Sequence, residues 1–351
     1  MPNPNTVKKL FLIFLTAILI AAAIAGYLLF GPSTAFSAGK YDLYIRTGMN
    51  YEAMFSGLRE DHVFSHPTVF DWVARRSGYP EKIKAGKYEI ESGISLFNLL
   101  KMLRNGHQVP VNLVITKLRT KSDLAGMVGR KLECDSTSFM DYLDNEDTLK
   151  AYALDSNTVM TAVFPDTYTY FWNTTPSRIF RKMEITSREF WTPGRIHLAE
   201  AHHLNPISAY ILASIVEEET TRKEDKPKIA SVYLNRLAAG MKLAADPTVK
   251  FALRNFELKR VYSKYLTVPS PYNTYMNLGL PPGPICTPSR ETIEAVLNAP
   301  STRYLYFVAR PDFSGYSNFA ETFAEHLQNA REYQKALDEQ MRISEQAKGN
   351  Q

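Results

Sequence analysis

The sequence is poor in residues that build metal, redox and nucleic-acid sites. Its only two cysteines, Cys134 and Cys286, lie far apart without metal-ligand or redox spacing, so two unpaired thiols are expected, with one disulfide as the alternative. The formal net charge of +5 includes no basic tract, which disfavours a nucleic-acid partner and allows an anionic polymer or a membrane surface. The sequence has neither a phosphate-binding glycine loop nor a GxSxG elbow, and it predicts no metal or cofactor.

One long apolar run stands near the N-terminus. Residues 10–30 carry no charge and are numerous enough to cross a bilayer as a helix. Lys8 and Lys9 precede the run, which predicts a single-pass protein of the cell (inner) membrane, with residues 1–9 cytoplasmic and the remainder extracytoplasmic or periplasmic. A cleaved signal peptide is the alternative, because residues 35–38 (AFSA) include small residues that a cleavage site needs. The apolar part of such signals spans about 7–15 residues, so an uncleaved anchor is preferred.

The chain after this run is predicted to be of α+β class. Its length favours two folded units, and 45% apolar with 22% charged residues is typical of a globular protein. After a linker at 31–40, strand and helix patterns follow the order β-α-α-β-α over 41–107. A connecting part at 108–204 is mainly helical and aromatic-rich. The densest signals fill the core at 205–340, and 341–351 form a polar tail.

Helix boundaries are clearest from residue 205 onward. Asn205 can cap a helix that has Pro206 at its first position, where the missing N–H costs nothing. A second helix is expected to stop at Gly240, and Asp246 is expected to cap a third. The stretch 270–300 contains a loop too rich in proline, glycine and tyrosine for a regular element, and ordered loops of this kind often form a ligand wall.

The segment SIVEEET places three glutamates at the end of the first of these helices. Successive helical residues are rotated by about 100°, so the three side chains cannot share a face. Glu218 has Arg222 four residues on, and Glu219 has Lys223, which predicts two ion pairs. Glu217 has no such cation, and its carboxylate neighbours, partly apolar setting and helix C-terminus would raise its pKa toward that of a general acid. A solvated helix end is the alternative, and the residues alone favour it.

Six short motifs follow one another: LASIVEEET, IASVYLNRL, DPTV, PYNTY, GLPPGPI and YLYFVA. In this order and spacing they resemble the membrane-anchored endolytic murein transglycosylases, the MltG or YceG-like family, over about residues 41–333. The resemblance implies that the first acidic residue after SIV, Glu217, is catalytic. It also implies a LysM-like subdomain at 41–107 that contacts glycan strands, with a packing module as an equal alternative, and then a YceG-like catalytic domain. Two departures are TKLRT at 116–120 instead of a PEG turn, and Ser317 where relatives often have histidine.

The resemblance further implies a reaction. Glu217 would protonate the glycosidic oxygen between MurNAc and GlcNAc in peptidoglycan glycan strands, and the C6 hydroxyl of that MurNAc would close on C1. The product is a 1,6-anhydro-MurNAc end, made without water, and such cuts in nascent strands would help end their elongation. Cell-wall synthases (penicillin-binding proteins) are the implied protein partners. The alternatives are a muramidase that uses the same glutamate with water and a non-catalytic glycan-binding scaffold.

Further residues within or beside these motifs are candidates for substrate binding. They supply carboxylate, amide, hydroxyl or aromatic groups: Glu219, Asn235, Asp246, Thr248, Tyr272, Asn273, Thr274 and Tyr275. Asn235 could bond Glu217 or an N-acetyl group, and N–H groups near Thr248 could receive an anionic carboxylate. Each also has a structural alternative, since a buried Asn can satisfy backbone groups, Asp246 can act only as a cap, and tyrosines can merely pack.

Overall fold

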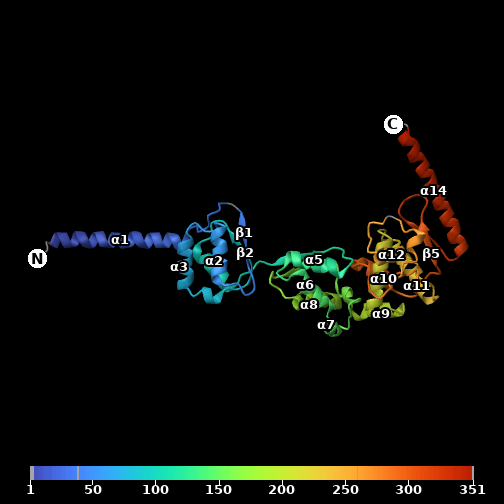
Figure 1. The fold of residues 1–351 in the computed structure, drawn as a ribbon, viewed down its shortest axis with the longest axis horizontal. Helices are drawn as coiled ribbons and strands as arrows, with labels where there is room; N and C mark the ends of the chain where they lie inside the picture. Colours follow the sequence, from blue (N-terminus) through green and yellow to red (C-terminus); the bar gives the residue numbers. More distant parts are fainter. Residues whose placement is uncertain (1–3, 38, 259, 350–351) are drawn as a thin grey trace. The chain divides into compact units, whose positions relative to one another are not determined.

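The computed structural model describes residues 4–37, 39–258 and 260–349 (Figure 1). The chain divides into two compact units. The first comprises the chain up to Asn112 with the short segments Lys131–Cys134 and Thr169–Thr175, and the second comprises the rest. The predicted cytoplasmic segment, the AFSA segment and the polar tail each extend outside the described residues, at residues 1–3, 38 and 350–351 respectively.

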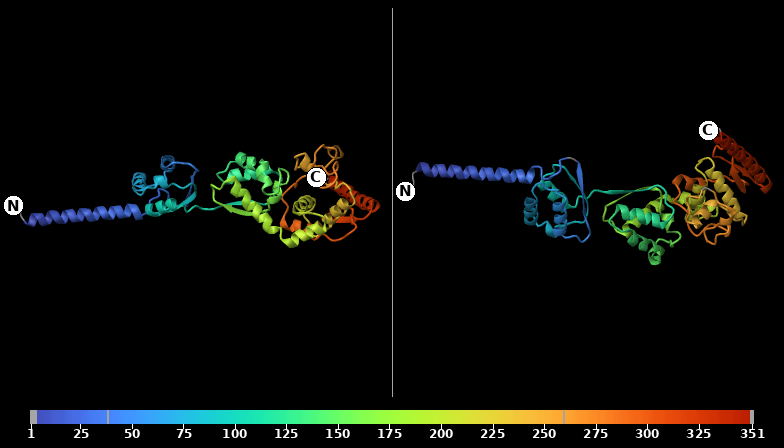
Figure 2. Two further views of the ribbon diagram at one scale, coloured as in Figure 1. Left: turned by 90° about the horizontal axis from the view of Figure 1, so that it is seen from below. Right: turned by 45° about the horizontal axis from the view of Figure 1, so that its top comes forward.

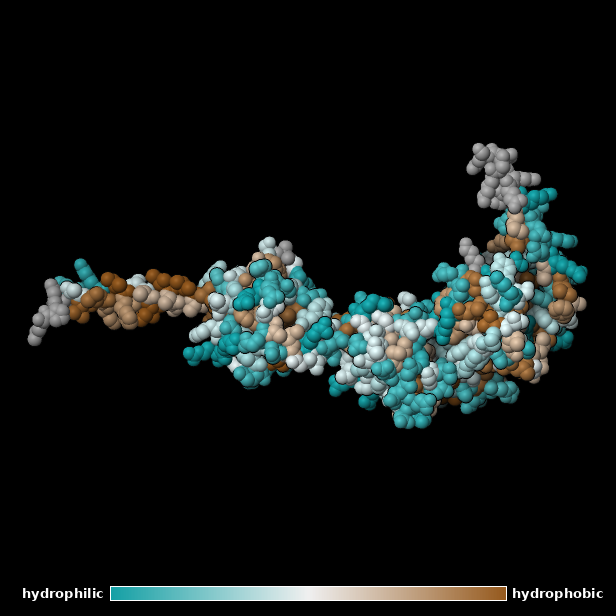
Figure 3. Space-filling view, viewed as in Figure 1, coloured by the Kyte–Doolittle hydropathy of each residue, from teal (hydrophilic) through white to brown (hydrophobic). Residues whose placement is uncertain are grey.

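The apolar run forms helix α1, Pro4–Phe30. The stretch Asn5–Phe30 is long and apolar enough to cross a membrane, and its most apolar window has no residue buried inside the protein. Figure 3 shows this helix as a mainly hydrophobic rod that ends at the first unit. Apart from its last turns, this helix is apolar and exposed all round, which is consistent with membrane anchoring.

The first unit pairs two strands and covers them with helices. Strand β1 (Lys40–Ile45) runs antiparallel to β2 (Gly86–Glu91). The other elements are α2 (Tyr51–Glu60), α3 (Pro67–Arg76), the 3-10 turn η1 (Pro80–Lys82) and α4 (Leu96–Asn105). Ile45, Phe70, Tyr88 and Leu99 are fully buried between them. The order β-α-α-β-α predicted from the sequence is confirmed.

The segment between α1 and β1 packs onto the first unit. Pro32 forms a β-bridge with Ser95. The backbone N–H and the hydroxyl of Ser33 both donate to the carbonyl of Ile94, at 3.0 and 2.7 Å. Ser33 and Thr34 are buried as a result. The stretch predicted to be a linker therefore attaches the subdomain directly to the end of α1.

The connecting part is mainly helical. Its elements are β3 (Val111–Ile115), α5 (Lys121–Lys131), α6 (Ser136–Asp144), α7 (Glu146–Lys150), η2 (Val159–Ala162), β4 (Asp166–Tyr170), α8 (Pro176–Phe190) and α9 (Pro193–Ala201). Strands β3 and β4 form a two-stranded sheet. Cys134 and Cys286 form no disulfide with each other.

Four helices build the core of the second unit: α10 (Pro206–Glu219), α11 (Lys226–Ala238), α12 (Asp246–Ala252) and α13 (Arg290–Leu297). Helix α10 packs against the other three, and Tyr210, Ile215 and Val216 on it are fully buried. Asn205 caps it in a reciprocal pair with Ser208, as the sequence predicts for the cap. In both views of Figure 2 these yellow and orange segments gather into one body. Surrounded on all sides, α10 holds its C-terminal glutamates in fixed positions.

A hairpin and a long helix complete the second unit. Strand β5 (Tyr306–Ala309) runs antiparallel to β6 (Ser317–Ala320), and α14 (Phe323–Gly349) contacts both. The short turn η3 (Ser263–Tyr265) lies in the loop before α13. Phe307 and Phe319 pack from the hairpin against the core around α10. The hairpin and the start of α14 are therefore fixed next to the helices that carry the motifs.

Candidate active site

The glutamates at the end of α10 enter three different environments. Glu217 contacts α11 and the start of α13, Glu218 contacts the segment after β3, and Glu219 faces a cavity beside α12 and α14. The helix ends here because Thr220 adopts an extended conformation, with φ of −149°. The predicted divergence of the three side chains is confirmed.

Glu217 is held by a network of donors. Its Oε2 accepts from Lys226 Nζ at 3.1 Å and from Ser289 Oγ at 3.0 Å, and the Thr292 hydroxyl also donates to it. Only 17% of the Glu217 side chain and 8% of the Lys226 side chain are exposed. Burial raises the pKa of Glu217, but the Thr292 hydrogen bond and the Lys226 charge outweigh it, so the pKa lies below its usual value.

The sequence prediction of a raised pKa for Glu217 is therefore wrong. The residue has a cationic partner, which stands nine residues on rather than four. Its pKa is lowered rather than raised. A lowered pKa favours the ionised form of this carboxyl group, which disfavours a role as proton donor. The contacts join α10, α11 and α13, as expected of a structural ion pair.

Glu218 is also ion-paired, but with residues of the TKLRT segment. Its Oε1 lies 2.6 Å from Lys117 Nζ, and its Oε2 lies 3.2 Å from Arg119 Nη2. Burial raises the pKa of Glu218, but the hydrogen bond and charge of Lys117 lower this pKa by more than burial raises it. The pKa of Glu218 therefore lies below its usual value. The predicted pair with Arg222 is wrong, because the Arg222 guanidinium donates to the carbonyl of Ser314.

Glu219 differs from both neighbours. Tyr233 donates its hydroxyl to Glu219 Oε1 at 2.5 Å, while Lys223, the predicted partner, pairs with Glu291. Burial is the main cause that raises the pKa of Glu219 to about 7. The hydrogen bond from Tyr233 lowers this pKa, and the charge of Asp246 raises it. A pKa raised this far favours the protonated form of the carboxyl group near neutral pH, in contrast to an ordinary glutamate.

The Glu219 cavity has a volume of about 490 Å³. Protein atoms surround the carboxyl group closely enough for desolvation to dominate, while part of the side chain remains accessible from the cavity. The lining residues are Glu219, Tyr233, Arg236, Ala244, Asp246, Tyr275, Tyr306, Phe307, Phe323 and His326. An acid with a raised pKa thus faces a space large enough for a ligand.

One wall of the cavity carries a fixed positive charge and stacked rings. Arg236 donates to the carbonyls of Leu305 and Leu243 at 2.7 and 2.6 Å, and its guanidinium carbon lies 5.4 Å from the centroid of the Tyr306 ring. The His326 ring stacks on Tyr306 with centroids 5.3 Å apart. Burial and then the charge of Arg236 lower the pKa of His326, so its ring is neutral at pH 7. Its Nδ1 is buried and has no hydrogen-bond partner in the described part of the chain.

Asp246 and Tyr275 line another side of the cavity. The Tyr275 hydroxyl donates to Asp246 Oδ1 at 2.7 Å. The prediction that Asp246 caps α12 is wrong, because Ala245 occupies the cap position and Asp246 begins the helix. Ala244 beside them has a φ of 49°, in the left-handed region that non-glycine residues rarely adopt. Backbone strain of this kind concentrates at functional sites.

Three of the predicted binding residues are buried behind the cavity. Thr248, Asn273 and Thr274 are each at most 1% exposed. Thr248 donates to the carbonyl of Ala245 at 2.6 Å, and Thr274 Oγ1 accepts from the N–H of Ala245 at 3.0 Å. The Asn273 amide donates to two backbone carbonyls at 3.0 and 2.9 Å. Their side chains are engaged in fixing the loop that presents Tyr275.

Two further candidates also lie outside the Glu219 cavity. Asn235 donates to two backbone carbonyls of the segment before β5, at 3.0 and 2.9 Å, instead of reaching Glu217. The Tyr272 ring packs on Phe251 with centroids 4.6 Å apart. Of the predicted site residues, the structure therefore brings together only Glu219, Asp246 and Tyr275.

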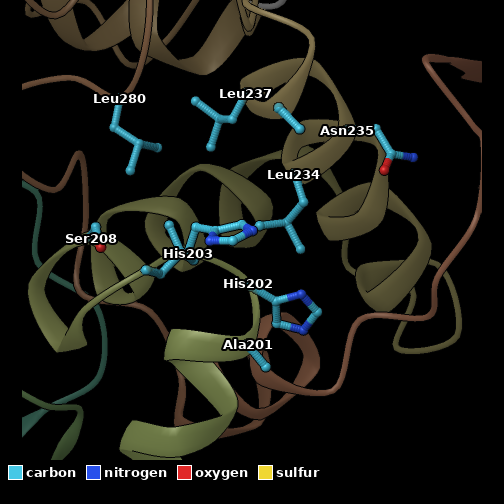
Figure 4. Close-up of a pocket in the computed structure, with 10 residues that line it drawn as sticks. Ala201, His202, His203, Ser208, Leu234, Asn235, Leu237 and Leu280 are labelled. Atoms are coloured by element: carbon cyan, nitrogen blue, oxygen red, sulfur yellow. The ribbon is translucent and has the colours of Figure 1, made fainter.

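Asn235 lies instead beside a second cavity of about 590 Å³, between the α9–α10 turn and α11. Figure 4 shows the His203 ring extending toward Leu234 across this space, with Leu237 and Leu280 above. The lining is mainly aliphatic, and none of the three glutamates contributes to it. This second cavity is therefore separate from the carboxyl groups of Glu217, Glu218 and Glu219.

Seven of the ten lining residues were not among the predicted site residues: Tyr233, Arg236, Ala244, Tyr306, Phe307, Phe323 and His326. Arg236 and Tyr306 both lie inside motifs of the sequence, IASVYLNRL and YLYFVA. They could have been predicted as site residues, because they are polar or aromatic motif residues to which no other role had been assigned. His326 lies outside those motifs, and only the fold brings it to Tyr306. Ser317, which stands where the resemblance led us to expect a histidine, does not line the cavity.

Known proteins of one family are similar to this chain. The model of the YceG-like family matches residues 43–332. An endolytic murein transglycosylase of Bacillus subtilis (strain 168) is 28% identical over 333 residues, which cover 91% of each chain. A protein of the same name from Streptococcus pneumoniae serotype 2 (strain D39 / NCTC 7466) is 27% identical over 92% of this chain and 64% of its own length.

A solved structure is similar as well. The crystal structure of a yceG-like protein from Listeria monocytogenes is 27% identical and has a TM-score of 0.55, over 82% of this chain and 98% of that chain. The family match covers most of the sequence and includes both the subdomain and the three glutamates. The chain belongs to the YceG-like family.

Proposed function

We propose that this chain is an endolytic peptidoglycan transglycosylase and that Glu219 is its general acid. The observation that carries the proposal is the carboxyl group of Glu219, with a pKa of about 7, at a cavity of about 490 Å³. Membership of the family and the names of the relatives from Bacillus subtilis and Streptococcus pneumoniae supply the reaction class and the substrate. The resemblance of motifs implies Glu217 for this role, and we assign the role instead to Glu219, two residues on, because Glu219 faces the cavity.

The reaction needs one group that first donates and then accepts a proton. Protonated Glu219 donates to the oxygen of the MurNAc–GlcNAc bond, and GlcNAc leaves with its hydroxyl restored as positive charge develops at C1 of MurNAc. The Glu219 carboxylate then takes the proton of the C6 hydroxyl, whose oxygen bonds to C1. The product is a 1,6-anhydro-MurNAc end. An intramolecular attacking group gains from proximity and consumes no water.

The remaining cavity residues suit an anionic glycan. Arg236, held by two backbone carbonyls, presents a fixed positive charge for a lactyl or peptide carboxylate. Phe323 is 57% exposed and offers an aromatic face for a sugar ring, and the neutral imidazole of His326 offers a hydrogen bond. The Tyr233 hydroxyl orients the acid through its bond to Oε1.

A muramidase is the second candidate function, and one observation favours it. Asp246 places another carboxylate in the same cavity, and hydrolytic glycosidases use a pair of carboxyl groups. In the structure this carboxylate accepts from Tyr275, which would leave it able to orient water. The two functions leave different ends on the cut strand.

The rest of the chain suits action at nascent strands. We assign α1 as an uncleaved anchor with the N-terminus in the cytoplasm, because Lys8 and Lys9 precede it. The catalytic unit would then lie outside the inner membrane, within reach of cell-wall synthases. The β-α-α-β-α unit is assigned as a LysM-like contact for glycan strands, by resemblance.

The test is digestion of purified peptidoglycan by the full chain in detergent, beside its Glu219→Gln variant. New strand ends are read by mass spectrometry, and circular dichroism establishes that both proteins are folded. We expect anhydro-MurNAc ends from the parent and none from the variant. Digestion of both mature and nascent strands separates substrate preference from lack of activity.

Other outcomes reassign the function. Reducing MurNAc ends from the parent would make the protein a muramidase. Absence of cleavage by the folded parent on both substrates would favour a glycan-binding scaffold. Full activity of the Glu219→Gln variant would remove Glu219 from the chemistry and return the role to another carboxyl group.

A further inference from the structure

We propose that the outer face of α3, together with the end of α1 and Phe97, forms a contact surface for the phospholipid bilayer, with Trp72 seated at the boundary between headgroups and acyl chains. The inference rests on the proposed role of α1 as an uncleaved anchor. It adds a second attachment, which would fix the orientation of the first unit on the membrane. This contact is independent of the proposed reaction and of which glutamate is the acid.

The length of the apolar run sets the level of the membrane surface. Its 21 residues, from Leu10 to Phe30, span about 31 Å at 1.5 Å per helical residue. That length matches the hydrocarbon core of a bilayer, which is about 30 Å thick. Phe30 therefore marks the outer edge of the core, and side chains beside the last turns of α1 lie in the interface.

Helix α3 lies at this level. A groove of about 310 Å³ is bounded on one side by the last turns of α1 and on the other by α3. Its lining residues are Ala25, Leu28, Leu29, Thr68, Val69, Trp72 and Val73. Figure 1 shows α3 beside the end of α1. An α1 that spans the bilayer thus brings the outer face of α3 into the membrane interface.

The first unit has little freedom to leave the membrane surface. Pro32, two residues after the end of α1, already bridges Ser95. Thr34 bridges Phe64 just before α3. Because these bridges follow the helix at once, the position of α3 relative to α1 is fixed by the fold.

Several exposed aromatic residues of the first unit lie at this level. Trp72 is 63% exposed, Phe97 50% and Phe30 66%. The rings of Phe30 and Phe97 lie 5.5 Å apart, so α4 joins the same surface. Tyr27 on α1 is exposed as well. Trp and Tyr concentrate at membrane–water interfaces, where an apolar ring and a polar edge are both accommodated.

The outer face of α3 carries both an apolar ring and polar groups, as a surface at the membrane interface requires. Thr68, Trp72 and Arg76 are exposed and follow one another at intervals of four residues, whereas Phe70 and Ala74 on the opposite face are fully buried. The Arg76 guanidinium lies 5.7 Å from the centroid of the Trp72 ring. A cation beside the indole suits lipid phosphates while the ring enters the acyl boundary.

The test uses the small number of tryptophans, which are Trp72, Trp172 and Trp191. Trp172→Phe and Trp191→Phe together leave Trp72 as the only indole in the full chain, which is reconstituted in lipid nanodiscs. The nanodiscs contain phosphatidylcholine brominated either near the headgroup end or near the methyl end of the acyl chain. The matched control retains only Trp172, which belongs to the same unit but is 8% exposed and packs on Tyr44 with centroids 5.0 Å apart.

We expect bromine near the headgroups to quench Trp72 fluorescence more than bromine at the methyl end, and neither to quench Trp172. If nanodiscs retain the chain but Trp72 is not quenched, the proposed lipid contact is wrong and the proposed anchor is not affected. The exposed face of α3 would then be a candidate contact for a second transmembrane protein. Stronger quenching by the deep bromine would overturn the interfacial position. A chain that nanodiscs do not retain would overturn the anchor and this inference, and would leave the proposed reaction untouched.

Discussion

Glu217 and Glu219 are two residues apart on one helix, and their surroundings differ in nearly every respect that governs proton transfer. Glu217 accepts from a lysine and two hydroxyl groups, faces two other helices, and has a lowered pKa. Glu219 accepts from one tyrosine, faces a cavity, and has a pKa raised to about 7. The first carboxyl group is stabilised as an anion, and the second is kept partly protonated.

The difference shows how little of a carboxyl group's chemistry depends on its own helix. Counting four residues onward gave Glu217 no cation, yet Lys226 reaches it from the next helix. The same count gave Glu219 a lysine that the fold pairs with Glu291. The charges that decide a pKa in a folded protein come mainly from tertiary neighbours.

The largest expected effect is on activity. Glu219→Gln should lower the rate of strand cleavage by about 10²–10⁴-fold, because a general acid contributes about that much. Glu217→Gln, measured at equal concentration of folded protein, should retain most of the parent rate. Release of soluble fragments from labelled peptidoglycan measures both. The opposite ranking of the two variants would restore Glu217 as the acid.

The next effect is on stability. Glu217→Ala leaves Lys226 buried without its anion and should lower the free energy of unfolding by about 3–5 kcal/mol. Urea denaturation of the parent and the variant measures the difference. The double variant Glu217→Leu/Lys226→Met removes both charges and should recover much of the loss. A single variant that unfolds at the parent's midpoint would show that the ion pair is not structural.

The pH dependence of cleavage should reflect Glu219. The rate requires its protonated form, so it should fall as pH rises through about 7. His326 does not account for this fall, because its pKa is lowered from 6.5. The Glu217→Gln variant should keep the same midpoint. A parent profile that is flat across pH 7 would contradict the raised pKa.

The same carboxyl group should influence stability with a defined sign. The folded-state pKa of Glu219 is about 7 and its ordinary value is 4.5, so the folded chain holds the proton more tightly. The stability that protonation of Glu219 contributes to the folded chain is fully present below pH 4.5 and is lost as pH rises through about 7. Glu219→Gln should therefore flatten the fall of stability in this window, measured by urea denaturation at several pH values.

The smallest effect distinguishes two tyrosines of one motif. Tyr275→Phe removes a hydrogen bond to Asp246 inside the cavity, which is worth about 1 kcal/mol and corresponds to roughly a fivefold loss in kcat/KM. Tyr272→Phe keeps the ring that packs on Phe251 and should leave kcat/KM unchanged. Equal effects of the two substitutions on kcat/KM would indicate that Tyr275 also has only a packing role.

Much of the fold could be predicted from the sequence because its signals are local. The apolar run, the cap at Asn205 and the β-α-α-β-α order depend on neighbours within a few residues, and the structure confirms them. The site could be predicted only in part. Asn273 and Thr248 are polar motif residues, and nothing in the sequence distinguishes a hydroxyl or amide that faces a cavity from one that bonds to backbone behind it.

The most direct test of the central claim is a titration of the two carboxyl groups by NMR. Glutamate labelled with ¹³C at the carboxyl carbon reports each group, and the Glu217→Gln and Glu219→Gln variants assign the two signals by their loss. We predict that the Glu219 signal titrates near pH 7 and the Glu217 signal below 4.5. A Glu217 signal that titrates near neutral pH beside an ionised Glu219 would contradict the account.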